Sequence, residues 1–344
     1  MRPDGALHHS TAFAQYAALR GLFGVFHMFG VGQNMRTATG AGSLYFRAIR
    51  RHRERAIGHI SRSFPHLSPS EVNDLAEKSV QSLFQMFMVE TVAIPRLLTP
   101  TSWPQYVKTG QIEESLRMLV RKDPILFVTG HCGNWELLGF VLALLGFRMS
   151  ALARPLDNPW IDRWLSDVRA ARGLQVITKW GATTEVQKLI EQGGRVGFIA
   201  DQNAGNDGMF VPFFGRLASS YKSIGLLAMR YEIPIVSGSA RRCDGTFSYE
   251  LNHADIIYPR DWKDQPDPLF YITARFNRAI EMAIRGAPEQ YLWVHRRWKS
   301  RPPHERLGRP MPDRLREKLR QLPWMTDEEM ERLEQRIEPL VPTV

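Results

Sequence analysis

A histidine and a glutamate five positions apart, His131 and Glu136, have the types and spacing that most suggest catalysis. They lie within residues 130–139, directly after the apolar run of residues 124–129. That run is typical of a buried strand, and apolar residues at helical spacing begin at Trp135, so we expect a strand-to-helix turn at the C-terminal edge of a sheet. A carboxylate that orients an imidazole there makes a general base. The pair is our first candidate for the active site.

Other interpretations of this pair are a helix cap or a surface ion pair, and spacing alone does not separate them from catalysis. Three glycines, Gly130, Gly133 and Gly139, favour close approach of the backbone to a ligand. We expect no metal, because the chain has no second group of His or Cys at ligand spacing. Cys132 has no sequence signature of a nucleophile, and we interpret it as a small turn residue.

The elements that must position His131 alternate along the chain. We expect strands at 147–153, 174–178, 196–200 and 234–240, and helices at 159–172, 183–191 and 219–231. This pattern predicts the α/β class, a central mixed sheet flanked by helices on both faces. His131 and Asp201 both follow predicted strands, and ligands of such sheets bind beyond the carboxyl ends of the strands.

Before the sheet, residues 68–71 (Ser-Pro-Ser-Glu) form a capping box that predicts the start of an amphipathic helix. Its apolar stripe, between Val72 and Met88, is either core or one wall of an apolar tunnel. Both interpretations fit the spacing.

Composition limits the partners. The 344 residues suffice for one large α/β domain with terminal additions, and two cysteines argue against a disulfide framework. The net charge of +10, with a pI near 9.8, predicts an anionic partner: nucleic acid, an acidic membrane surface or a phosphorylated substrate.

The first 66 residues favour the membrane surface. Residues 21–35 carry no formal charge but are too short for a transmembrane span, and aromatic residues surround them. Residues 47–62 then hold six arginines against one acid, Glu54. We expect a membrane-interfacial helical segment in which arginines contact anionic headgroups. The alternative is a core-packing helix with a solvated basic face.

Two later segments also suggest binding. The polar loop at 201–208 follows a predicted buried strand and is either a turn into a hairpin or a substrate-contacting loop. Residues 291–301 concentrate Arg296, Arg297, Lys299 and Arg301 beside aromatic residues. These arginines could clamp a phosphate, or they could belong to a solvated basic chain end.

Five blocks in order resemble the bacterial lipid A biosynthesis acyltransferases, the lauroyl/myristoyl transferase branch of the lysophospholipid acyltransferase superfamily. The resemblance covers about residues 42–302, and its blocks are the arginine-rich stretch ending in 63–68, the His131–Glu136 turn, 153–159, 200–203 with 211–215, and 295–302. The chain departs from the family's usual pattern at Asn203, where a second aspartate is frequent, and in its charged tail.

The resemblance implies a fatty acyl transfer from an acyl thioester to a hydroxyl, with His131 as the base and Glu136 as its orienting partner. It implies Arg154 and Arg169 as contacts for substrate phosphate or transition-state charge, with Arg163 and Arg172 as alternatives on the same helix. Asp201 would shape the site, and Gln202 would bind substrate. No cofactor is expected beyond the donor, either acyl carrier protein or acyl-CoA.

The resemblance also implies the setting. We expect a monomer at the cytoplasmic face of the inner membrane, acting on a lipid A precursor or a related anionic glycolipid or lysolipid. The domains would be 1–66 (membrane-associating), 67–303 (acyltransferase) and 304–344 (charged helical tail). Nucleic acid is not an expected partner, because no recognised binding module is present. The competing class is a non-enzymatic basic protein that binds membrane surfaces.

Overall fold

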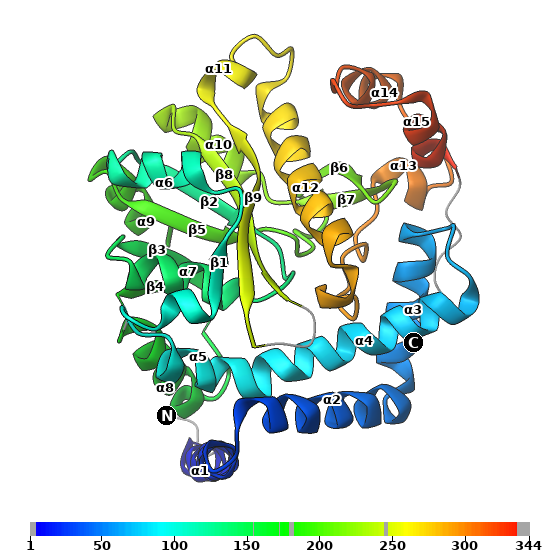
Figure 1. Ribbon diagram of the computed structural model, residues 1–344. Helices are drawn as coiled ribbons and strands as arrows, with labels where there is room; N and C mark the ends of the chain where they lie inside the picture. The colour runs from blue at the N-terminus through cyan, green and yellow to red at the C-terminus, as the bar shows by residue number, and fades with distance from the viewer. Residues whose placement is uncertain (1–4, 154, 172, 179–181, 244–246, 336–344) are drawn as a thin grey trace.

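A seven-stranded sheet in the order β1-β9-β8-β2-β5-β3-β4 forms the centre of the computed structural model (Figure 1), which describes residues 5–335 except 154, 172, 179–181 and 244–246. Its strands are Val107–Thr109 (β1), Ile125–Thr129 (β2), Met149–Ala153 (β3), Leu174–Thr178 (β4), Arg195–Ile199 (β5), Ile235–Arg242 (β8) and Tyr249–Ile257 (β9). Of the strand pairs described in this sheet, β8 and β9 alone are antiparallel, and the others are parallel. The predicted mixed sheet is confirmed.

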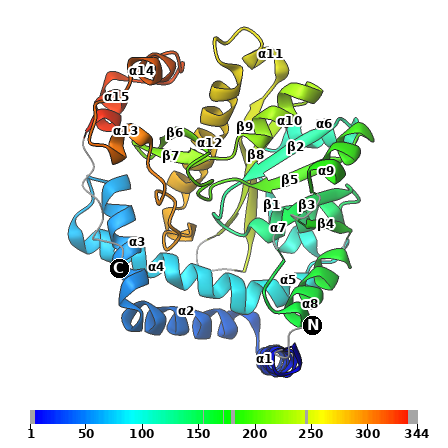
Figure 2. The same ribbon diagram turned by 180° about the vertical axis from the view of Figure 1, so that it is seen from behind.

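Helices cover both faces of this sheet, as predicted (Figures 1 and 2). Ile125 and Phe127 of β2 pack with α6 (Glu113–Val120) and α7 (Trp135–Leu144). Leu126 and Val128 point the other way, into the core formed with α9 (Ala182–Glu191), α10 (Ser223–Tyr231) and α12 (Pro268–Gly286). Burial on both faces explains why β2 is a continuous apolar run rather than an alternating one.

One predicted helix starts later than expected. Residues 219–231 have helical spacing, but α10 begins only at Ser223, because Arg216–Ser220 (β7) pairs antiparallel with Met209–Phe213 (β6). The loop at 201–208 therefore leads into a hairpin, one of the two alternatives.

The first four helices described are Gly5–His27 (α1), Val31–Ala48 (α2), Arg50–Ser63 (α3) and Pro69–Gln85 (α4), all before the sheet. The predicted capping box opens α4: the Glu71 amide donates to Ser68 Oγ (3.3 Å), and the Ser68 amide donates to Glu71 Oε2 (2.8 Å). A π-helical turn, Met86–Glu90, and α5 (Thr91–Leu97) continue it. Among the described helices, none has both the length and the apolar character needed to cross a bilayer.

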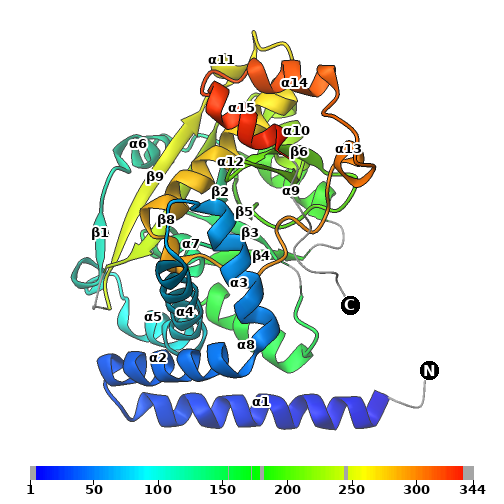
Figure 3. The same ribbon diagram turned by 90° about the vertical axis from the view of Figure 1, so that its right-hand side faces the viewer.

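The two ends of the described chain pack at opposite ends of the molecule (Figure 3). Helix α1 lies against α8 (Pro159–Ala170), where the rings of Phe23 and Trp164 are 5.4 Å apart. The tail forms α13 (Pro303–Arg306), α14 (Asp313–Arg320) and α15 (Asp327–Glu334). Its Leu319, Met330 and Leu333 are buried in the main core. Short helices α11 (Pro259–Trp262), η2 (Trp103–Gln105) and η3 (Pro288–Gln290) complete the fold.

Candidate active site

His131 and Asp201 meet at the carboxyl edge of the sheet because their strands are neighbours in register. Strands β2 and β5 are parallel, with Thr129 opposite Ile199, so the second residue after each strand falls side by side. The imidazole Nδ1 of His131 lies 2.7 Å from Asp201 Oδ1, and the His131 amide donates to Asp201 Oδ2 at 3.0 Å. One carboxylate thus holds both the ring and the backbone of His131.

Asp201 is ionised at neutral pH. Burial raises the pKa of its carboxyl group, but the charge of His131 and the two hydrogen bonds from that residue lower it by more, to about 2. A carboxylate at Nδ1 fixes the proton of a neutral imidazole there and leaves the lone pair on Nε2. Nε2 lies 3.4 Å from the Gln202 side-chain nitrogen. The structure therefore brings together His131, Asp201 and Gln202 of the predicted site residues.

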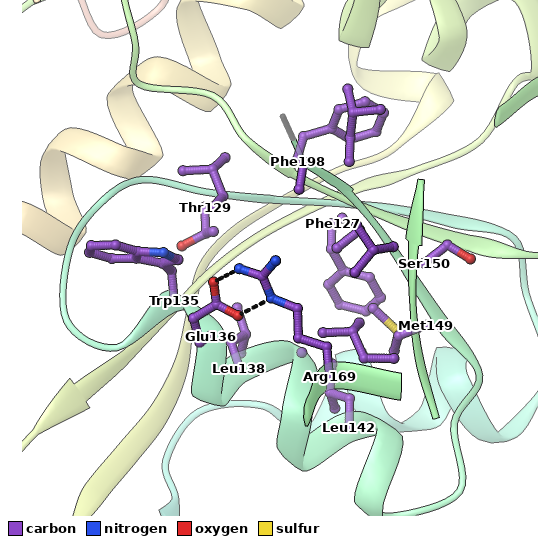
Figure 4. Close-up of a pocket in the computed structure, with 18 of the residues that line it drawn as sticks. Phe127, Thr129, Trp135, Glu136, Leu138, Leu142, Met149, Ser150, Arg169 and Phe198 are labelled. Carbon is purple, nitrogen blue, oxygen red and sulfur yellow. Dashed lines mark hydrogen bonds and ion pairs between the residues drawn. The ribbon is translucent and has the colours of Figure 1, made fainter. Parts of the chain in front are cut away.

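Glu136 does not orient His131, which corrects the partnership expected from the sequence. Its carboxylate faces Arg169 of α8, which donates from Nε to Oε2 (2.8 Å) and from Nη2 to Oε1. Glu136 occupies the first turn of α7, which lies over a face of the sheet, so its side chain points across that face instead of toward the edge (Figure 4). The structure thus joins the predicted residues Glu136 and Arg169 to each other.

Of the arginines weighed for α8, Arg169 enters the site, whereas Arg163 is exposed. Arg172 and Arg154 lie outside the described residues, so the structure places neither.

An apolar pocket lies between the sheet and α7, with the Glu136–Arg169 ion pair in its wall (Figure 4). Aliphatic and aromatic side chains from five elements line most of it: Phe127, Leu138, Leu142, Met149, Leu152, Leu174, Val176 and Phe198. Trp135 also lines the pocket, and its ring contacts the His131 ring edge-on at a centroid distance of 4.8 Å. Trp135 therefore connects the wall of the pocket to the imidazole.

The turn that carries His131 is built from backbone contacts that only a glycine permits. Gly133 has φ +63°, and a Cβ there would lie 2.2 Å from the Ala240 carbonyl oxygen. Asn134 follows as the cap of α7: its Oδ1 accepts from the Leu137 amide (2.8 Å), and its Nδ2 donates to buried Glu90 (2.6 Å). Glu90 is also paired with Arg242.

Sequence reasoning missed this support. An asparagine just before a helix is a cap signal that was available in the sequence, whereas Glu90 comes from the distant π-helical turn and left no local signal.

The segment after α12 closes the site from the other side. The Leu292 amide donates to the His131 carbonyl (3.1 Å), and the Gly133 amide donates to the Gln290 carbonyl (3.0 Å). Tyr291 and His295, also missed from the sequence, lie near Asp201: burial and the Asp201 charge raise the pKa of the Tyr291 hydroxyl well above its usual range. Burial lowers the pKa of His295 to about 4. Both side chains are therefore neutral at pH 7.

Arg297 is a structural residue, not a phosphate clamp. It is buried, and its donors serve protein acceptors at Gln202 O (3.2 Å), Ser220 Oγ (2.7 Å), Asn277 Oδ1 (2.9 Å) and Ser219 O. Arg301 is engaged likewise by Leu217 O and Glu305. Asn203, which departs from the family's usual aspartate, bonds to Ser300 (3.2 Å). These contacts tie the 201–208 loop to the segment of residues 297–301.

Cys132 is buried next to this site, and its thiol is unsuited to nucleophilic attack. Burial raises the pKa of the thiol far above its usual range, and the charges of Asp201 and Glu289 raise it further. The thiolate, not the thiol, is the nucleophile of cysteine enzymes. Within the part of the chain that the structure describes, no three His, Cys, Asp or Glu side chains form a group that could hold a metal ion.

Comparison with known proteins finds one family, both by its sequence model and by individual relatives. Residues 6–300 match the sequence model of the family described as bacterial lipid A biosynthesis acyltransferase. The lauroyltransferase of lipid A biosynthesis from Escherichia coli K12 is 26% identical over 281 residues, which cover 78% of this chain and 85% of that protein. The palmitoleoyltransferase of the same strain is 26% identical over 267 residues (74% and 81%), and its myristoyltransferase is 24% identical over 264 residues (74% and 77%).

Proposed function

Because the chain belongs to the bacterial lipid A biosynthesis acyltransferase family, we propose that it moves a fatty acyl chain from an acyl thioester to a hydroxyl of a lipid A precursor or a related glycolipid. One observation carries the proposal: an imidazole oriented by a buried carboxylate contacts Trp135, a residue in the wall of an apolar pocket. A base beside an apolar pocket suits a reaction between a hydroxyl and an acyl group.

His131 is the general base of the proposed reaction. A lipid hydroxyl is nearly un-ionised at neutral pH, so Nε2 takes its proton as the new carbon–oxygen bond forms. Asp201 keeps Nδ1 protonated and stabilises the imidazolium, as the carboxylate does in a catalytic triad. When the carbon–sulfur bond breaks, the imidazolium returns the proton to the leaving thiolate. The substrate hydroxyl attacks directly, so no acyl-enzyme forms.

The acyl chain occupies the apolar pocket in this proposal. Its lining supplies apolar contact along most of its length, and Trp135 places the pocket beside the base. The Glu136–Arg169 pair fastens α7 to α8 at the pocket wall, so these two residues shape the donor site rather than orient the base. Gln202, next to Nε2, contacts the reacting groups. Arg154 remains a candidate contact for substrate phosphate.

Acyl carrier protein is the proposed donor, with coenzyme A as the alternative carrier, and the proposed active species is a monomer. The proposed location is the cytoplasmic face of the inner membrane, with the aromatic and arginine-rich first 66 residues at the bilayer surface.

Purified protein tests the activity. With acyl carrier protein charged with a fatty acid and a lipid A precursor, we expect release of free thiol together with an ester product seen by mass spectrometry. A non-enzymatic membrane-binding protein would release no thiol, and that result with folded protein would refute the proposal. Mass spectrometry of membrane lipids from a deletion strain identifies the acceptor.

A further inference from the structure

The fold brings two arginines of α3, Arg51 and Arg55, near Arg296 of the segment that follows α12. Helix α3 runs along the segment that leads from α12 to α13 (Figure 3), with His59 Nδ1 2.9 Å from the Trp293 carbonyl oxygen. One helical turn earlier, Arg55 Nη1 donates to the Val294 carbonyl (3.0 Å). Moving back along α3 thus moves forward along the segment. Arg51 lies one further turn back on α3, and Arg296 lies two residues beyond Val294 along the segment.

Electrostatics agree with this alignment. The pKa of Arg55 is lowered, first by burial and then by the charges of Arg296 and Arg51. The three side chains are called the arginine cluster below.

The arginine cluster concentrates positive charge in a small region. Among the residues that the structure describes, neither Arg51, Arg55 nor Arg296 has an Asp or Glu oxygen within 4.0 Å, whereas the adjacent Arg50 is paired with Glu54 at 2.6 Å. Like charges one helical turn apart destabilise a helix, and partial burial of Arg55 adds to that cost. The hydrogen bond from Arg55 to the Val294 carbonyl offsets part of this cost but leaves the positive charge unneutralised, so a bound anion is a natural counter-charge.

The cluster adjoins the proposed reaction centre. Leu292, in the same segment, donates to the backbone of His131, and His295, next to Arg296, lies within electrostatic range of Asp201, His131 and Arg55. Arg297 and Arg301 are committed to protein acceptors, which leaves Arg296 as the arginine of this segment available to a ligand.

We propose that Arg51, Arg55 and Arg296 form a phosphate-binding subsite that holds a phosphorylated substrate next to His131. Planar guanidinium groups bind phosphate oxygens in pairs, and a group of three suits a phosphate monoester or diester. The inference rests on the proposed acyl transfer and assigns one part of its substrate recognition. The phosphate belongs either to the acceptor glycolipid or to the phosphopantetheine arm of the donor.

Steady-state kinetics of Arg55→Gln, Arg296→Gln and the double variant test the subsite. The loss of a charge-assisted hydrogen bond should raise the KM of the substrate whose phosphate binds, either acceptor or donor, at least about tenfold, with kcat little changed. Arg50→Gln, on the same helix but paired with Glu54 and exposed, is the matched control and should behave as wild type. Arg55→Lys, which keeps the charge and loses the fork, should lie between wild type and Arg55→Gln.

Substrates that lack a phosphate show whether the bound phosphate belongs to the acceptor or to the donor. If the acceptor phosphate binds, the wild-type preference for a phosphorylated over a dephosphorylated glycolipid should disappear in the double variant. If the donor phosphate binds, the preference for acyl-CoA over acyl-N-acetylcysteamine should disappear instead. Unchanged preferences on both sides in a folded double variant would overturn the subsite, whereas an inactive wild-type protein would refute the acyl transfer itself.

A binding measurement separates the subsite from catalysis. Inorganic pyrophosphate is titrated into the His131→Ala protein in a calorimeter. We expect a heat of binding that is absent in the triple variant His131→Ala/Arg55→Gln/Arg296→Gln. Equal heats in the two proteins would contradict the proposal whatever the activity.

Discussion

At the scale of single residues, the site depends on which carboxylate serves His131. The sequence placed His131 correctly after a buried strand but suggested Glu136, five residues away, as its partner. The partner in the structure is Asp201, seventy residues on, because neighbouring parallel strands end side by side. The order of strands in a sheet is not encoded in local spacing, so the partnership could not be read from the chain. The sequence did allow the prediction that His131 and Asp201 each follow the end of a strand.

Matched substitutions distinguish the role of Asp201 from that of Glu136. His131→Ala should lose about two to four decades of kcat. Asp201→Asn should also lose decades, because the amide no longer fixes the proton on Nδ1. Glu136→Gln, the same chemical change at the pocket wall, should act mainly on the KM for the acyl donor. Thiol release measures all three, and circular dichroism controls for folding. An inactive Glu136→Gln beside a nearly normal Asp201→Asn would restore the partnership suggested by the sequence.

Cys132→Ala should retain most activity, because the buried thiol stays protonated and the proposed mechanism has no acyl-enzyme. Labelled acyl donor followed by denaturing electrophoresis checks this point. Label that stays on wild-type protein and disappears with the cysteine would contradict direct attack by the hydroxyl.

One buried histidine, His59, and one partly buried histidine, His295, make stability depend on pH. Burial lowers the pKa of His59 to about 3 and that of His295 to about 4. Between these values and the unfolded pKa near 6.5, the unfolded chain binds more protons, so stability is full above pH 6.5 and falls as the pH drops.

Each histidine should cost about 1.4 kcal/mol per pH unit in that window. Urea unfolding at pH 7 and pH 5 measures the loss, which His59→Gln should reduce. An unchanged pH dependence in His59→Gln would show that His59 is not responsible. Asp201, with a pKa of about 2, loses its contribution only below about pH 3.8.

At the scale of elements, the sequence predicted those whose signals are local. Strand β4 has the predicted bounds, 174–178, and the capping box opens α4 as expected. The helix predicted from Ser219 was wrong at its start, since β7 pairs with β6 and tertiary pairing overrides helical spacing. Strand β9 was missed, because its residues alternate between apolar and polar side chains only irregularly.

The cap of α7 joins stability to catalysis. Asn134→Ala removes the cap and leaves Glu90 without one partner, so it should lower the unfolding free energy by about 2 kcal/mol and reduce activity. Thr326→Ala removes the cap of α15, far from the site, and should cost about 1 kcal/mol without affecting kcat. Denaturant unfolding and thiol release distinguish them. Equal activities in the two variants would mean that the turn tolerates loss of its cap.

At the scale of the whole molecule, the N-terminal helices offer apolar side chains to the surroundings. Leu22, Val25, Met28 and Phe29 lie at the junction of α1 and α2 with exposed fractions of 45%, 52%, 79% and 44%. The rings of Phe23 and Phe26 are buried instead, so the segment has both an inner and an outer face. The inner face fits the interpretation as a core-packing helix, and the outer face is the one that would contact a membrane in the interfacial interpretation, which stays a prediction.

Replacing the four exposed residues with asparagine should move the protein from the membrane to the soluble fraction without unfolding it. Apolar area buried in the bilayer contributes to attachment, and these side chains contribute little to the core. Val120→Asn/Leu307→Asn, which changes exposed apolar residues of other elements, is the control. Sedimentation with vesicles of anionic lipid measures the difference. Equal sedimentation of all the proteins would exclude this surface as the attachment site.

The contacts of Arg297 set the order in which activity appears during synthesis. The ribosome delivers α1 to α3 first, then the strands that carry His131 and Asp201, and only afterwards the arginine that ties the 201–208 loop to α12 and the β6–β7 hairpin. If the N-terminal helices bind the bilayer as proposed, a nascent chain reaches the membrane surface before its reaction centre is complete. The proposed catalyst would then gain its activity only after it has been attached to the membrane.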